Sequence, residues 1–181
     1  LEYDDVRRGP RQYNRDGNEW YDEQAVRWQR RRTSNRQPGV FQGPRADLIV
    51  CAEDDITRDY LDSFAVPPLV VTCKDRKVPS VQEACRDTGC VNRLFNIGFI
   101  KERDRDFPSY LADVKDQLDL GTSVILHCRG GVHRAPMSFL LCMYYLFGMD
   151  FDQATRAIDE IRRVDWNGIM QDSYDNGGRF H

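Results

Sequence analysis

The sequence predicts an α/β fold, a compact domain in which helices flank a central, mainly parallel sheet. From residue 46 onward, short apolar runs typical of strands alternate with longer segments whose apolar residues recur at helical spacing. The chain has 181 residues, enough for one domain with its own core and an additional segment. We therefore place the domain at 46–181 and treat 1–45 as an N-terminal extension.

Each element of the domain has its own signal. Short apolar runs bounded by turns predict strands at 47–52, 69–73, 93–97 and 123–127. Apolar residues at helical spacing predict helices at 57–64, 109–120, 135–147 and 151–164. The last helix carries one apolar stripe, which we interpret as packing against the core: Phe151, Ala154, Ile158, Ile161 and Val164.

The extension is rich in arginine and has few aliphatic residues, so it is not expected to form a second domain. One helix is predicted within it, at 19–32. The basic cluster from Arg27 to Arg36, interrupted by Trp28, suggests contact with RNA, an acidic partner or anionic lipid. The alternative is a solvated face without a partner.

Composition excludes several classes of protein. A net charge of −3 and a pI near 5.6 argue against a protein that binds nucleic acid over its whole surface. The six cysteines lack the close pairs of a disulfide-rich secreted scaffold, so an intracellular compartment, cytoplasmic or nuclear, is expected. We expect no transmembrane segment, signal peptide or prenylation box.

The most informative stretch runs from His127 to Pro136, His-Cys-Arg-Gly-Gly-Val-His-Arg-Ala-Pro. It joins a predicted strand to an apolar helix, and a loop that opens into a helix N-terminus directs backbone N–H groups toward an anion. Gly130 and Gly131 allow close approach of the backbone to a ligand. Arg134 offers a planar fork to phosphate oxygens, and the positive surroundings favour the nucleophilic thiolate of Cys128.

These residues also carry a family resemblance. His127-Cys128, Gly131 and Arg134 match the HCxxGxxR signature of the cysteine-dependent protein tyrosine phosphatases, and the chain resembles their compact dual-specificity branch. Arg134-Ala135-Pro136 is similar to the phosphatases of regenerating liver, which also carry alanine at this position. Stretches 69–73, 104–109 and 151–168 resemble the same group.

The resemblance implies a phosphatase that hydrolyses phosphomonoesters of protein tyrosine, serine or threonine through a phosphocysteine, with no metal or cofactor. Cys128 attacks phosphorus, and Arg134 holds the phosphoryl oxygens. The remaining loop residues are the predicted substrate-binding residues: Arg129, Gly130, Gly131, Val132 and His133. For His133, a solvent-facing position is the alternative.

A leaving oxygen needs a proton, so the mechanism requires a general acid outside the loop. Asp104 is our choice, because its spacing to Pro108-Ser109 resembles that of the acid in the family. The segment that carries it is predicted as a loop ahead of the helix at 109–120. Asp106 and Glu102 are the alternatives, and plain solvated charges are the other interpretation.

Three further residues are expected to modify the reaction. His127 is predicted to orient the strand end and tune the thiol, with a satisfied buried histidine as the alternative. Ala135 replaces a hydroxyl that in most relatives assists breakdown of the phosphocysteine, so turnover is expected to be slow. Cys73 ends a predicted strand and is a candidate partner for a reversible disulfide with Cys128. Its alternative is an inert buried cysteine.

Two other functions stay open at this point. The first is a phosphate-binding or protein-binding module similar to a pseudophosphatase. The second is a phosphatase acting on RNA 5′ ends or phosphoinositides, which Arg129 and the basic cluster weakly favour.

Overall fold

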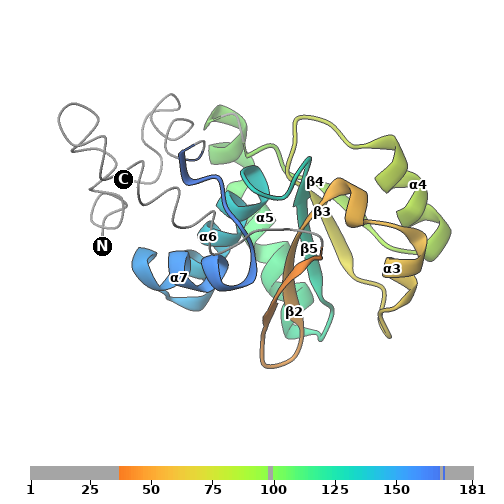
Figure 1. The fold of residues 1–181 in the computed structure, drawn as a ribbon, viewed down its shortest axis with the longest axis horizontal. Coiled ribbons are helices and arrows are strands. Elements are labelled where there is room, and N and C mark those ends of the chain that lie inside the picture. The colour runs from red at the N-terminus through yellow and green to blue at the C-terminus, as the bar shows by residue number, and fades with distance from the viewer. Residues whose placement is uncertain (1–36, 98–99, 168, 170–181) are drawn as a thin grey trace.

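The computed structural model describes residues 37–97, 100–167 and 169. Five strands form one sheet in the order β1-β2-β5-β3-β4 (Figure 1). The strands are β1 Gly39–Gln42, β2 Asp47–Ala52, β3 Leu69–Thr72, β4 Asn92–Leu94 and β5 Val124–Cys128. Strands β2, β5, β3 and β4 run parallel to one another, and β1 runs antiparallel to β2 at the edge of the sheet. The predicted α/β fold with a mainly parallel sheet is confirmed.

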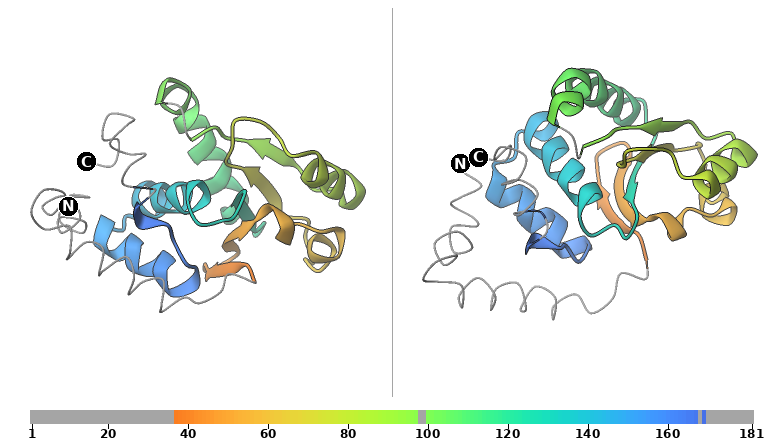
Figure 2. Two further views of the ribbon diagram at one scale, coloured as in Figure 1. Left: turned by 45° about the horizontal axis from the view of Figure 1, so that its top comes forward. Right: turned by 90° about the horizontal axis from the view of Figure 1, so that it is seen from above.

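Helices cover both faces of the sheet (Figure 2). On one face lie α5 (Ile100–Asp119), α6 (Arg134–Phe147) and α7 (Phe151–Ile161). On the other lie α3 (Arg58–Asp62) and α4 (Pro79–Thr88), and a 3-10 turn at Glu53–Asp55 (η2) follows β2. The sheet is therefore buried on both sides, which is the usual condition of parallel strands.

Strand β5 is the central strand, and all five of its residues are buried. Its side chains alternate between the two cores: Val124 and Leu126 face the helices α5 to α7, whereas Ile125 faces α3 and α4. This burial holds the strand firmly up to its last residue, Cys128. The loop that follows leaves the carboxyl edge of the sheet, where ligands bind in open α/β folds.

Most predicted elements are present with small shifts in their ends. The strand predicted at 47–52 coincides with β2, whereas that at 93–97 is replaced by the shorter β4. Three elements were missed, β1, the short η2 and α4. The signals for α4 are a proline, Pro79, in its first turn and a glycine, Gly89, at its C-terminal end with a φ of 75°.

One expectation was wrong. The acidic segment predicted as a loop before residue 109 belongs to α5, which begins at Ile100 and continues through Pro108. An interior proline removes one backbone donor and crowds the carbonyl four residues earlier, and aromatic packing on both sides of Pro108 favours the continuous helix. The rings of Phe107 and Tyr110 stack on Phe95, with centroids 6.3 Å and 3.9 Å away.

Two predictions concern residues outside the described part of the chain, the helix at 19–32 and the basic cluster Arg27–Arg36. The side chains of 100–106 are not described either. Strand β1 lies inside the segment 1–45, and the division of the chain at residue 45 stays a prediction. Within the described ranges, no helix is long and apolar enough to cross a membrane.

Candidate active site

Cys128 ends β5, and Arg134 begins α6, so the loop 129–133 spans the gap between a buried strand and the N-terminus of a buried helix. The thiol of Cys128 is 3% exposed, at the base of this loop. The backbone N–H of Ala135, in the first turn of α6, donates to Cys128 Sγ at 3.4 Å. An N–H donor and the positive end of a helix both stabilise negative charge on the sulfur.

The scaffold binds every carbonyl group from Cys128 to His133. The donors are, in order, His127 Nδ1 at 3.1 Å, Glu53 N at 3.0 Å, Arg162 Nη2 at 3.0 Å, Arg162 Nε at 2.9 Å, Asp165 N at 2.6 Å and Met137 N at 3.1 Å. In a trans peptide unit the N–H points opposite to the C=O. Because the carbonyls are held by neighbouring groups, we infer that the loop amides point to the opposite side of the loop, which we call its concave side, as an anion site requires.

Gly131 is required by its surroundings. Its φ is +71°, and a Cβ at this position would lie 2.5 Å from Cys51 O and 2.6 Å from Arg162 Nη2. Neither the backbone of a central strand nor a buried guanidinium moves away easily. Glycine is therefore required at 131 by contacts with the protein itself, whereas its predicted role, close approach of the backbone to a ligand, stays a prediction.

His127 joins the loop to the neighbouring strands through a buried chain of hydrogen bonds. Its Nδ1–H donates to Cys128 O, so Nε2 must be the acceptor for the Thr72 hydroxyl, 2.7 Å away. Thr72 Oγ1 in turn accepts from Asn92 Nδ2 at 3.0 Å. Burial, the main cause, lowers the pKa of His127, and the network needs the neutral ring.

Cys73 follows β3 directly and lies beside Cys128. Thr72 pairs with His127 in the parallel register, and Cys73 N donates to His127 O at 2.7 Å. Adjacent strands are about 5 Å apart, which places the two cysteine Cα atoms within the roughly 7 Å that a disulfide allows. Both side chains face the same core, whereas Cys51 on the other neighbouring strand faces the opposite one.

The other predicted site residues divide into two groups. Arg129 is exposed, Val132 and His133 are half-buried, and Ala135 is fully buried within the first turn of α6. Asp104 belongs to α5, and its side chain lies outside the described part, so its role as the acid stays a prediction.

Sequence reasoning missed Arg162, at the end of α7, and the backbone donors of Glu53 and Asp165. Arg162 falls within the helix predicted at 151–164, beside another arginine, a pattern typical of a solvated helix end. No signal in the sequence marks it as buried, because its partners lie far away along the chain. Four of the six bonds to the loop carbonyls, those from Glu53, Arg162 and Asp165, are tertiary.

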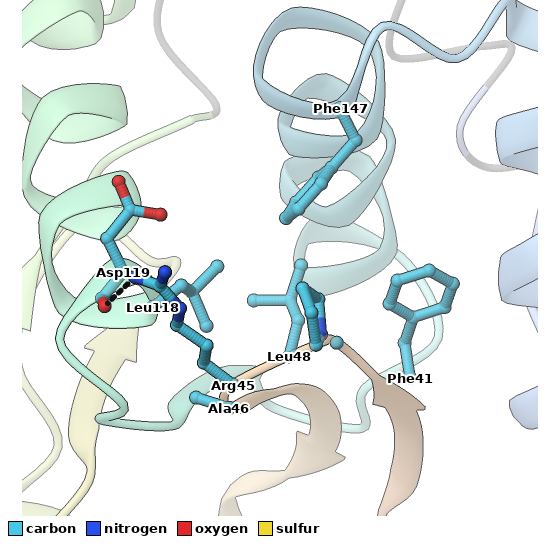
Figure 3. A pocket seen from close by; sticks show the side chains of 9 residues that line it. Phe41, Arg45, Ala46, Leu48, Leu118, Asp119 and Phe147 are labelled. Atoms are coloured by element: carbon cyan, nitrogen blue, oxygen red, sulfur yellow. Dashed lines mark hydrogen bonds between the residues drawn. The ribbon is translucent and has the colours of Figure 1, made fainter.

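Two hollows lie away from the loop. One, of about 400 Å³, is mainly apolar and sits at the opposite edge of the sheet, between the turn after β1 and the ends of α5 and α6 (Figure 3). Arg45 Nη1 donates there to Asp119 O at 3.1 Å. The other, of about 590 Å³, borders the edge strand β4. Neither contains a cysteine or histidine, and in the described ranges no group of three or more potential metal ligands comes together.

Comparison with known proteins agrees with this architecture at the level of the fold. No protein-family model and no curated protein matches the sequence. Among solved structures, the chain is similar to Tk-PTP in its active form (TM-score 0.56, 16% identity, covering 78% of this chain and 98% of that one). It is also similar to the PTP-2 phosphatase of Cydia pomonella (0.57, 14%, 74% and 87%) and to PTPMT1 (0.55, 11%, 79% and 98%).

The fold is that of the protein tyrosine phosphatases. At 11–16% identity these similarities establish the fold of the part of the chain that they cover. The protein-tyrosine-phosphatase-like domain predicted from the sequence is confirmed as a fold, and the special likeness to the phosphatases of regenerating liver stays a prediction.

The buried, neutral His127 should make stability depend on pH. Its pKa in the folded protein is below the ordinary 6.5, so the unfolded chain takes up a proton that the folded chain does not. Stability is therefore fully present above about pH 6.5 and falls below it, by at most ~1.4 kcal/mol per pH unit for this one group. Urea unfolding of the wild type and His127→Asn between about pH 7 and pH 5 measures the difference.

We expect His127→Asn to lose less stability over this range than the wild type. His133→Asn, which replaces the half-buried histidine of the loop, is measured in parallel to separate the contribution of the second histidine. An equal loss in the wild type and in His127→Asn would contradict the buried neutral ring.

Proposed function

We propose that the protein is a phosphatase that hydrolyses phosphomonoesters through a phosphocysteine intermediate. The observation that carries this proposal is the loop 128–133, whose carbonyls are all hydrogen-bonded to neighbouring groups of the protein, next to a buried cysteine that accepts from an amide at the start of α6. Such a loop suits an anion with several oxygens, and in the proposed reaction the thiol at its base is the nucleophile that attacks the central atom.

The proposed reaction has two steps. Cys128 attacks phosphorus while the loop amides and the guanidinium of Arg134 bind the equatorial oxygens, and Asp104 protonates the leaving oxygen. Water then attacks the phosphocysteine and releases phosphate. The substrates are phosphorylated proteins carrying phosphotyrosine, phosphoserine or phosphothreonine.

The second step is proposed to be slow. Ala135 is fully buried beside the thiol and carries no hydroxyl, so it provides no donor or acceptor for the water that must discharge the intermediate. The same feature underlies the proposed kinship with the phosphatases of regenerating liver.

Replacing the nucleophile tests the function directly. Cys128→Ser should abolish hydrolysis of an aryl phosphate measured in the presence of a metal chelator, because an ordinary serine hydroxyl is not ionised at neutral pH. The control is Cys142→Ser, which removes another fully buried thiol of the same core and should retain activity. In the wild type we expect a burst of one product equivalent followed by slow turnover.

Unchanged hydrolysis by Cys128→Ser would overturn the mechanism. Absence of hydrolysis by the wild type, combined with phosphate or phosphopeptide retained on Cys128→Ser, would favour a binding module. Retention of 5′-phosphorylated RNA or phosphoinositide in place of phosphopeptide would redirect the substrate assignment.

Leaving groups of different basicity test the acid. Asp104→Ala should slow cleavage of a poor leaving group, such as an alkyl phosphate, by about 10²–10⁴-fold and leave a good aryl leaving group nearly unaffected. The reason is that only the poor leaving group needs a proton in the transition state. Asp106→Ala and Glu102→Gln are the matched controls, and transfer of the effect to either one would move the acid to that residue.

We also propose that Cys73 protects Cys128 from irreversible oxidation. Peroxide converts the Cys128 thiolate to a sulfenic acid with release of hydroxide, and the Cys73 thiol then displaces water to form a disulfide. The register that brings the two residues side by side supports this pairing. Burial raises the pKa of Cys73 well above its ordinary value, so disulfide formation should be slow at neutral pH and faster in mild base.

Peroxide followed by a thiol reductant should restore activity in the wild type and in Cys51→Ser but not in Cys73→Ser. Cys51 is the control because it lies at the same level of the sheet but faces the other core. Peptide mapping should find Cys73 joined to Cys128. A disulfide between Cys128 and Cys142, or full recovery in Cys73→Ser, would show that Cys73 is not the partner.

A further inference from the structure

Arg162 is a buried charge whose place in the fold needs an explanation. Its side chain is 0% exposed, and it lies where α7 ends, with an extended backbone (φ −154°, ψ 146°) that turns the side chain under the phosphate-binding loop. Removing a charge from water costs several kcal/mol, and apolar replacements of such groups are often neutral or stabilising. Packing alone therefore does not account for an arginine at this position.

All three nitrogens of the guanidinium donate hydrogen bonds. Nε donates to Gly131 O at 2.9 Å, Nη2 to Gly130 O at 3.0 Å and Nη1 to Gln37 O at 2.7 Å. The Asp55 carboxylate, 4.0 Å from Nη2, offsets part of the buried charge. Burial is the main cause that lowers the pKa of Arg162, yet an arginine remains protonated at neutral pH.

The two loop carbonyls bound by Arg162 decide where two amides point. Because C=O and N–H of one trans peptide unit point in opposite directions, holding Gly130 O fixes the N–H of Gly131, and holding Gly131 O fixes the N–H of Val132. Both units include a glycine, and glycine rotates its peptide planes at little steric cost. Without the guanidinium, either carbonyl is free to turn toward the concave side and to oppose an anion there.

We propose that Arg162 is a positioning residue for the phosphatase reaction: it locks the Gly130 and Gly131 peptide units so that the amides of Gly131 and Val132 face the phosphoryl group. The inference rests on the proposed function, because it concerns how the same loop binds the transition state. Arg162 acts through the loop and touches neither the substrate nor the thiol in this role. Gly131 is its structural counterpart, since a Cβ there would lie 2.6 Å from Nη2.

The geometry distinguishes this role from simple electrostatic attraction. Lysine would keep the positive charge but has a single nitrogen at a point, which cannot span the Gly130, Gly131 and Gln37 carbonyls as the planar guanidinium does. Glutamine would lose the charge but keep a planar amide with two N–H donors for the loop carbonyls. The two variants therefore separate charge from the direction of the donors.

The test compares Arg162→Lys and Arg162→Gln with the wild type and with Arg156→Met. Arg156 is an exposed arginine on the same helix, paired with Asp152, and serves as the matched control. Urea unfolding establishes that each variant is folded. Aryl phosphate hydrolysis then gives kcat and KM, and inhibition by orthovanadate reports binding of a transition-state-like oxyanion.

We expect Arg162→Lys to lower kcat/KM by about 10²-fold, mainly through kcat, and to weaken vanadate inhibition in parallel, because misdirected donors lose most where charge develops. Arg162→Gln should retain more activity than Arg162→Lys despite its missing charge. Arg156→Met should match the wild type in both measurements.

Folded variants with wild-type kcat, KM and vanadate inhibition would overturn the inference, and so would a loss of stability unaccompanied by a kinetic change. A lysine variant more active than the glutamine variant would show that charge, not donor direction, is what the loop needs, and would also overturn it. A wild type that neither hydrolyses aryl phosphate nor binds vanadate would instead overturn the proposed function.

Discussion

The candidate site depends on the hydrogen bonds by which neighbouring groups hold the carbonyls of its loop. Six consecutive carbonyls, from Cys128 to His133, accept hydrogen bonds from the scaffold. A loop of this length satisfied by water would leave its amides free to point in many directions. Once the carbonyls are held, the directions of the amides are fixed as well, so in the proposed reaction they need no reorganisation when negative charge develops.

The elements around the loop contribute according to their place in the fold. Buried β5 places the thiol at the carboxyl edge of the sheet. Its neighbours β2 and β3 bring Cys51, the Thr72 hydroxyl and Cys73 to the same edge. Helix α6 supplies the N-terminus that faces the sulfur, and the chain after α7 supplies Arg162 and the amide of Asp165. Two of these features cost stability: a buried guanidinium and, below about pH 6.5, a buried histidine that is held neutral. Such costs concentrate at functional sites.

Much of the fold was predictable because its strands are short apolar runs and its helices carry apolar stripes. The strand at 47–52 and the helix that follows the loop were placed closely, since burial on both faces leaves a strong pattern. The elements that were predicted poorly have weak or conflicting local signals. Strand β1 is four residues long at a sheet edge, and α5 runs through a proline that local rules treat as a stop, next to Phe107 and Tyr110, which both stack on Phe95.

By itself the sequence determined that a cysteine, two glycines and an arginine lie on one strand-loop-helix unit, because those residues are neighbours in the chain and their chemistry is local. Only the tertiary structure decided which groups hold the loop open toward an anion. Arg162 lies 31 and 32 residues from the carbonyls that it binds, and the Thr72 hydroxyl lies 55 residues from His127. These pairings depend on strand order and helix packing, which bring distant residues together, and no spacing along the chain encodes them.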